Sequence, residues 1–181
     1  MVFGWSTPLL PIHLLWVNLI TDSLPAIALG LDRPEENVME ASPVSTDKSL
    51  FSGGLGYRIA YEGFMIGILA LTAFGIGHKY FDTGEIHNIS RTMAFAVLSI
   101  SQLFHAFNMR TEGSIFKIHI LSNRYLCLAF LVGIAMQASV IMIPFLSEIF
   151  SVTPLNMEQW AIVMGLSFVP VIFVEFEKKI L

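Results

Sequence analysis

The sequence predicts an all-α membrane protein: a bundle of five transmembrane helices, the first of them locally unwound near Asp22 and Pro25. Three observations lead to this fold class. Of the 181 residues, 55% are hydrophobic and only 13% are charged, whereas a soluble domain carries about 25% charged residues. Five apolar stretches approach the length of about 20 residues that a helix needs to cross a bilayer. The first stretch also carries an amide, a hydroxyl, a carboxylate and a proline near its middle.

The five predicted spans cover residues 8–31, 59–77, 92–109, 125–143 and 159–174. The fourth contains no charged residue and is the clearest of them. The fifth is the shortest and contains Pro170. The third carries several polar residues, among them Gln102 and His105, so it is the second polar helix of the bundle. We expect spans four and five to act as scaffold.

Composition also excludes several classes of function. The net charge of −4 is spread along the chain, and no basic patch indicates a nucleic-acid partner. A single cysteine, Cys127, rules out an internal disulfide and a four-cysteine metal site. The partner that the apolar spans predict is the lipid bilayer, and no nucleic acid is expected.

The polar residues of the first span are spaced to share one helix face. Asn18 lies three residues before Thr21 and four before Asp22. A carboxylate at membrane depth costs a few kcal/mol or more, which makes Asp22 a functional-site candidate. Pro25 has no N–H, so the carbonyl of Thr21 loses its helical partner. An oxygen-rich, broken helix of this kind is how membrane proteins build a cation site.

The run Leu-Trp-Val-Asn-Leu-Ile-Thr-Asp-Ser-Leu-Pro-Ala-Ile-Ala-Leu-Gly, residues 15–30, resembles the sixth transmembrane helix of P-type calcium-transporting ATPases. The later spans are similar in order, spacing and length to helices seven to ten of that family. The resemblance covers essentially the whole chain, and it implies that residues 1–181 form the C-terminal transmembrane domain of such a pump. It further implies a cell-membrane location, with the remaining transmembrane helices and the cytoplasmic domains of the pump as partners. By the same resemblance, the polar loop from Asp32 to Leu55 is a cytoplasmic coupling loop that docks against the phosphorylation domain, and the alternative is a solvated connector.

The resemblance also assigns metal ligands. It implies Asn18 and Asp22 as ligands of one Ca²⁺ site, while Thr21 and the position of Gln102 match a second site. Pumps with two sites are expected to carry a glutamate where Gln102 stands, so we expect one Ca²⁺ per cycle. The alternative role for Gln102, which we favour, is a hydrogen bond to a neighbouring helix.

Two other polar residues have simpler expected roles. Glu62, near the end of the second span, is expected at the membrane interface rather than as a ligand. His105 is expected to be a polar packing residue, because no metal-ligating residue lies at a suitable spacing.

The resemblance implies ATP and Mg²⁺ as cofactors only through domains outside this chain. The sequence contains no Asp-Lys-Thr-Gly phosphorylation motif and no nucleotide-binding region. We therefore expect the chain alone to be inactive as an ATPase, although it belongs to an enzyme when joined to those domains.

Basic residues predict the orientation in the membrane. The segments between spans one and two and between spans three and four, together with the tail, hold eight of the ten Lys and Arg residues. Only Lys79 and Arg91 lie on the other side. Since cytoplasmic segments carry the excess of basic residues, the C-terminus is predicted to be cytoplasmic and the N-terminus external. An external N-terminus without a signal sequence predicts further helices upstream.

Three alternatives stay open at this point. A secondary transporter or channel segment would use Asp22 as a proton or sodium site, although the spans show no internal repeat of the kind common in such transporters. A P-type pump for Na⁺, Mn²⁺ or H⁺ would use the same ligands. A membrane scaffold would simply satisfy a buried Asp22 with hydrogen bonds.

Overall fold

The computed structural model describes residues 7–32, 55–82, 88–110 and 123–180, without the side chains of Thr21, Asp22, Lys179 and Ile180. These residues form helices and connecting turns only, so the predicted all-α class is confirmed. The first rod consists of α1 (Pro11–Val17), a π-helical turn η1 (Asn18–Asp22) and α2 (Ser23–Gly30). It is followed by α3 (Leu55–Tyr80), α4 (Asn88–Asn108), α5 (Arg124–Met142), a short α6 (Pro144–Ile149) and α7 (Met157–Ile180).

Short-range sequence signals define several helix ends. Proline occupies the first turn of α1 and of α6, where its missing N–H costs no hydrogen bond. Asn123 caps α5 by accepting a hydrogen bond from the N–H of Leu126 at 2.9 Å. Before α7, Asn156 and Gln159 each accept the other's backbone N–H, in a capping-box arrangement.

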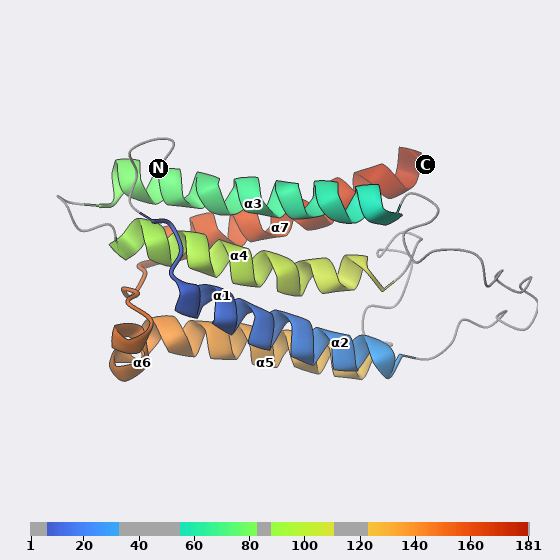
Figure 1. Ribbon diagram of the computed structural model, residues 1–181, viewed down its shortest axis with the longest axis horizontal. Coiled ribbons are helices and arrows are strands. Elements are labelled where there is room, and N and C mark those ends of the chain that lie inside the picture. Colours follow the sequence, from blue (N-terminus) through green and yellow to red (C-terminus); the bar gives the residue numbers. More distant parts are fainter. Residues whose placement is uncertain (1–6, 33–54, 83–87, 111–122, 181) are drawn as a thin grey trace, which may run out of the picture.

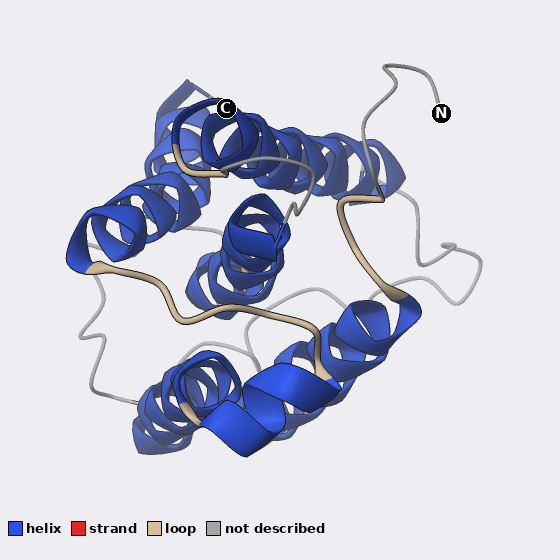
Figure 2. Cartoon of the chain, turned by 90° about the vertical axis from the view of Figure 1, so that its left-hand side faces the viewer, coloured by secondary structure: helices blue, strands red, loops and turns tan. Residues whose placement is uncertain are grey.

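The long helices form two layers on either side of α4 (Figure 1). The first rod packs along α5 on one side, and α3 packs along α7 on the other. Helix α4 contacts α3, α5 and α7, and the end-on view in Figure 2 shows one helix surrounded by the others. The largest buried cluster accordingly combines α4 residues with one residue each from α3, α5 and α7: Met93, Ala96, Val97, Ile100, Ala73, Ile141 and Val163.

Four of the described helical segments are long and apolar enough to cross a membrane: Pro11–Gly30, Leu55–Tyr80, Arg124–Met142 and Met157–Lys178. Helix α4 occupies the place of the predicted third span but is not among them. More than half of its 21 residues are buried, including Ser99 and Ser101. The surrounding helices therefore shield α4, which allows it to carry polar residues. Together with the exposed apolar side chains on the outer helices, such as Leu15, Leu131 and Phe64, this arrangement is that of a multi-pass membrane protein.

A group of neutral side chains, which we call the His13 cluster (His13, Trp16, Phe95, Gln137 and Phe150), holds the start of the first rod. The Leu10 N–H donates to Nδ1 of His13 at 3.2 Å, which leaves Nε2 as the protonated nitrogen, and Nε2 lies 2.6 Å from the Phe150 carbonyl oxygen. His13 is fully buried and stacks on Phe95 with ring centroids 4.4 Å apart. Trp16 donates to Gln137 of α5 at 3.1 Å.

The other end of the first rod is held by a charged pair and an amide. Arg110, just after α4, binds both carboxylate oxygens of Asp32 at 2.6 and 3.3 Å. Asn123 donates its side-chain amide to the Ala28 carbonyl oxygen at 3.0 Å. The first rod is therefore attached to the rest of the bundle on both sides of its π-helical turn.

Candidate cation-binding groove

The irregularity expected in the first span is present as the π-helical turn Asn18–Asp22. A π turn hydrogen-bonds from residue i to i+5 and is rare, and such turns occur frequently at functional sites. The turn ends three residues before Pro25, whose ring would crowd the carbonyl of Thr21 in a regular α-helix. The wider turn relieves this crowding and keeps the rod continuous, so the backbone carbonyls here depart from the regular α-helical pattern.

A groove of about 600 Å³ opens beside this turn, between the first rod, α3 and α4. Its apolar walls come from all three of these segments. Its polar lining residues are Asn18, Glu62, Gln102 and His105. The groove extends from Asn18, in the middle of the first rod, toward the end of the bundle where α3 begins and α4 ends.

Two of the four site residues predicted from sequence line this groove. Asn18 is exposed at its wall, and Gln102 of α4 is half-buried across from it, although the two lie 84 positions apart in the sequence. The backbones of Thr21 and Asp22 belong to the π turn, but their side chains lie outside the described part of the chain. The assignment of all four, Asn18, Asp22, Thr21 and Gln102, as ligands stays a prediction.

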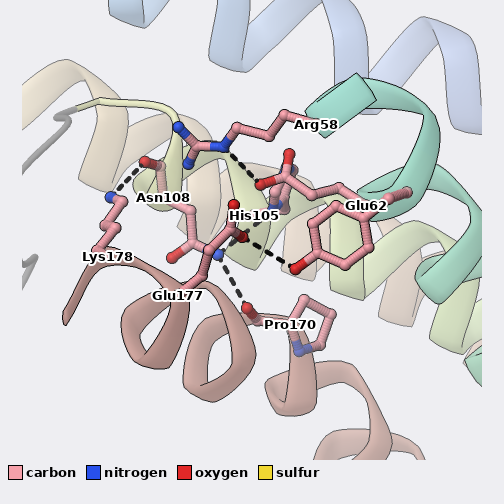
Figure 3. A network of polar contacts seen from close by, with 8 residues as sticks. Arg58, Glu62, His105, Asn108, Pro170, Glu177 and Lys178 are labelled. Atoms are coloured by element: carbon pink, nitrogen blue, oxygen red, sulfur yellow. Dashed lines mark hydrogen bonds and ion pairs between the residues drawn. The ribbon is translucent and has the colours of Figure 1, made fainter. Parts of the chain in front are cut away.

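Sequence reasoning missed the role of Glu62. It was expected at the interface, yet its side chain is only 3% exposed. Arg58 donates from Nε to one carboxylate oxygen at 2.9 Å, and Nε2 of His105 lies 3.2 Å from the other (Figure 3). Arg58 and Glu62 are four residues apart on one helix, a spacing that predicts an ion pair, so the sequence did contain a signal for the Arg58–Glu62 contact.

His105 is held in place from its other side. Asn108 directs its side-chain nitrogen both to Nδ1 of His105, at 3.3 Å, and to the carbonyl oxygen of Pro170 in α7, at 3.2 Å. Nδ1 of His105 therefore accepts, and Nε2 carries the proton that faces Glu62. We call Arg58, Glu62, His105 and Asn108 the Glu62 network. It joins α3, α4 and α7 beside the groove (Figure 3).

The described residues contain no cluster of three or more His, Cys, Asp or Glu side chains that could hold a metal ion by themselves. The oxygen atoms among the polar side chains of the groove are the amide oxygens of Asn18 and Gln102 and the carboxylate of Glu62, which is engaged by Arg58 and His105. These are hard oxygen ligands, of the kind that Ca²⁺ and Mg²⁺ prefer.

Several curated proteins are similar to this chain. Calcium-transporting ATPase 1 of Bacillus cereus is 43% identical over 192 residues, covering 98% of this chain and 21% of the relative. The calcium-transporting ATPase of Bacillus subtilis is 39% identical over 94% of this chain and 19% of the relative. Calcium-transporting ATPase 1 of Lactococcus lactis is 34% identical over 99% of this chain and 20% of the relative. The chain thus spans about a fifth of the length of these relatives.

The family described as "Cation transporting ATPase, C-terminus" matches residues 6–180, which is nearly the entire chain. The match confirms the resemblance that rested on the motif of the first span and on the order of the later ones. With its helical membrane bundle and its polar, π-distorted first rod, this chain belongs to the C-terminal family of cation-transporting ATPases.

Proposed function

We propose that this chain forms part of the transmembrane ion pathway of an ATP-driven Ca²⁺ pump and supplies cation ligands from its first rod. It also supplies a cytoplasmic coupling loop, most of which, residues 33–54, lies outside the described residues. The observation that carries the proposal is the π turn Asn18–Asp22, which lies within a membrane-spanning segment and beside a groove lined by amide groups. Support for calcium as the ion comes from the relatives, which are named as calcium-transporting ATPases.

The ligands of this chain are too few to enclose calcium. Ca²⁺ takes about six to eight oxygen ligands at about 2.3–2.6 Å. Asn18, Thr21 and Asp22 provide three side chains, and the distorted backbone adds one or two carbonyl groups. The other ligands come, in this proposal, from further transmembrane helices of the same pump on the open side of the groove. ATP and Mg²⁺ bind to cytoplasmic domains of the longer protein, and this chain alone does not hydrolyse ATP.

The proposed stoichiometry is one Ca²⁺ per cycle. A dehydrated divalent cation needs charged ligands, and Gln102 contributes none. A second cation near Thr21 and Gln102 would meet strong repulsion from the first in the low dielectric of the membrane. In this proposal, Gln102 therefore forms hydrogen bonds at the groove wall and is not a cation ligand.

The decisive variant is Asp22→Asn in the full-length chain that contains this segment, reconstituted in vesicles. We expect complete loss of ATP-dependent Ca²⁺ uptake, because the variant removes the carboxylate from the π turn. The matched control is Glu158→Gln, which neutralises an exposed carboxylate at the start of α7 and leaves uptake unchanged. Uptake by Asp22→Asn at the parent rate would show that the site assignment is wrong.

The same vesicles separate the other candidate functions. A ratio of one Ca²⁺ per ATP with a Hill coefficient near one supports a single site, whereas two Ca²⁺ per ATP contradicts it. Activation by Na⁺ or Mn²⁺ in place of Ca²⁺ identifies a pump for another cation. Uptake without ATP identifies a secondary transporter or a channel.

A further inference from the structure

A positive charge, Arg58, lies next to the groove wall and is paired with a buried carboxylate of that wall, Glu62. Arg58 is 26% exposed, and its Nε donates to Glu62, whose side chain is 3% exposed. Both residues lie on α3, in the half of that helix that borders the groove. Arg58 remains charged under all ordinary conditions, so the charge at this wall depends on Glu62.

The Glu62 carboxylate is fixed in its position from a second helix. One oxygen faces Arg58 and the other faces the Nε2–H of His105, so both are engaged. His105 is fixed in turn by Asn108, which is anchored to the Pro170 carbonyl oxygen of α7. With both of its oxygens engaged, the carboxylate is held against Arg58 and kept from turning into the groove.

The network borders the groove, so its net charge affects the free energy of a cation bound there. Glu62 and His105 line the groove together with Asn18, and Gln102 is one helical turn from His105 on α4. Charges separated by protein and lipid interact over longer distances than charges in water. A net positive charge at this wall would raise the free energy of a divalent cation bound at Asn18 and Asp22.

We propose that Glu62 is a positioning residue that sets the cation affinity of the groove by neutralising Arg58, and that His105 and Asn108 hold it in that place. The proposal rests on the proposed function as a cation pump. It assigns Glu62 no direct contact with the ion. Its consequence is that Arg58 and Glu62, although they form one ion pair, have opposite effects on cation affinity.

The test measures Ca²⁺ activation of ATPase activity in the full-length pump for three variants. Glu62→Gln removes the carboxylate that Arg58 binds directly and is expected to raise the half-activating Ca²⁺ concentration by roughly threefold to tenfold. Arg58→Gln leaves a negative charge at the wall and lowers that concentration. The double variant restores neutrality and returns it to within about twofold of the parent. Glu177 of α7 also interacts electrostatically with Arg58, which keeps the expected shift severalfold rather than total.

Tyr61→Phe provides the matched control. It removes the hydrogen bond from the Tyr61 hydroxyl to Glu177, at 2.9 Å, beside the same network without changing any charge. The Ca²⁺ dependence of this variant should equal that of the parent. An ion pair with a purely structural role would lower the maximal rate in both single variants, without opposite shifts in Ca²⁺ dependence, and that result would overturn the proposal.

Other results of the same experiment also decide between the proposals. If Glu62→Gln fails to assemble, Arg58→Gln decides alone: higher apparent Ca²⁺ affinity supports the proposal, and unchanged or lower affinity refutes it. If the parent pump is not activated by Ca²⁺, or if Asp22→Asn transports normally, the proposed function fails. A third result separates the two proposals: the parent depends on Ca²⁺ and Asp22→Asn is inactive, but Arg58→Gln and Glu62→Gln shift the Ca²⁺ dependence in the same direction. That result would contradict the role of Glu62 and leave the proposed function intact.

Discussion

The His13 cluster and the Glu62 network both hold helices together, but they do so with different kinds of side chains. Both connect helices far apart in the sequence, and both place a histidine between a donor and an acceptor: His13 is fully buried, and His105 is partly buried. The His13 cluster is neutral, with aromatic rings around its hydrogen bonds. The Glu62 network is charged and borders the groove. The difference shows that a neutral set of side chains and a charged set can both join helices, and that the charged set is the one beside the groove.

The largest expected effect on stability is at the His13 cluster. His13→Phe keeps the ring that stacks on Phe95 but removes both hydrogen bonds, so the Phe150 carbonyl and the Leu10 N–H lose their partner. The cost is about 3 kcal/mol, since each unsatisfied buried group costs roughly 1–3 kcal/mol. Thermal inactivation of the full-length pump should shift to lower temperature, with unchanged Ca²⁺ dependence in the surviving fraction.

Thr72→Val is the control for this variant. It also removes a side-chain hydrogen bond, but the Thr72 hydroxyl binds only the carbonyl oxygen of Ile68 in its own helix. Equal loss of stability in the two variants would contradict this prediction. It would show that the hydrogen bonds of His13 contribute no more to stability than a hydrogen bond within one helix.

A smaller effect is expected at Gly77, where α3 lies against the backbone of α4. A Cβ atom added at Gly77 would lie 2.5 Å from the Cα of Ser90, and backbone atoms cannot move away as a side chain can. Gly77→Ala should therefore cost about 2 kcal/mol in unfolding free energy, as overpacked sites do. Gly165→Ala, where nothing lies within 4 Å of the added atom, should be neutral or slightly stabilising. Thermal inactivation compares the two, and equal stability would contradict the close contact.

The smallest effect is expected at the ion pair that joins the end of the first rod to α4. Asp32→Asn weakens the two bonds from Arg110, and partly exposed ion pairs contribute about 1 kcal/mol or less. The reversed pair, Asp32→Arg with Arg110→Asp, should recover most of that loss in a double-mutant cycle of thermal inactivation. A loss as large as that of His13→Phe would show that charged contacts also carry the stability of the fold.

Much of the fold was predictable because membrane spans depend on local hydropathy. The predicted fourth span, 125–143, differs from α5 by one residue at each end. The fifth, 159–174, is shorter than α7, because that helix continues through the charged residues of its last turns. The short helix α6 after Pro144 was not predicted, since six residues give too little periodicity. The orientation in the membrane stays a prediction.

The site was predictable only in its local part. The spacing of Asn18, Thr21 and Asp22 and the presence of Pro25 indicated a distorted polar helix, and the distortion lies at those residues. That Gln102 lines the same groove as Asn18 is a property of packing between helices. The burial of Glu62 depends on His105, 43 positions away, so a charge near the end of an apolar run was interpreted as an interfacial residue.

The π turn has a consequence for how the first rod can move. Such a turn holds one residue more than a regular turn, and absorbing that residue into an α-helix would rotate everything beyond it by about 100° about the helix axis. His13 blocks such a rotation of α1, while the contacts of Ala28 and Asp32 block it for α2. The extra residue is thus trapped between two fixed ends. It cannot be absorbed into a regular α-helix without breaking a bond at one of them, and so the rod keeps an irregular turn between them.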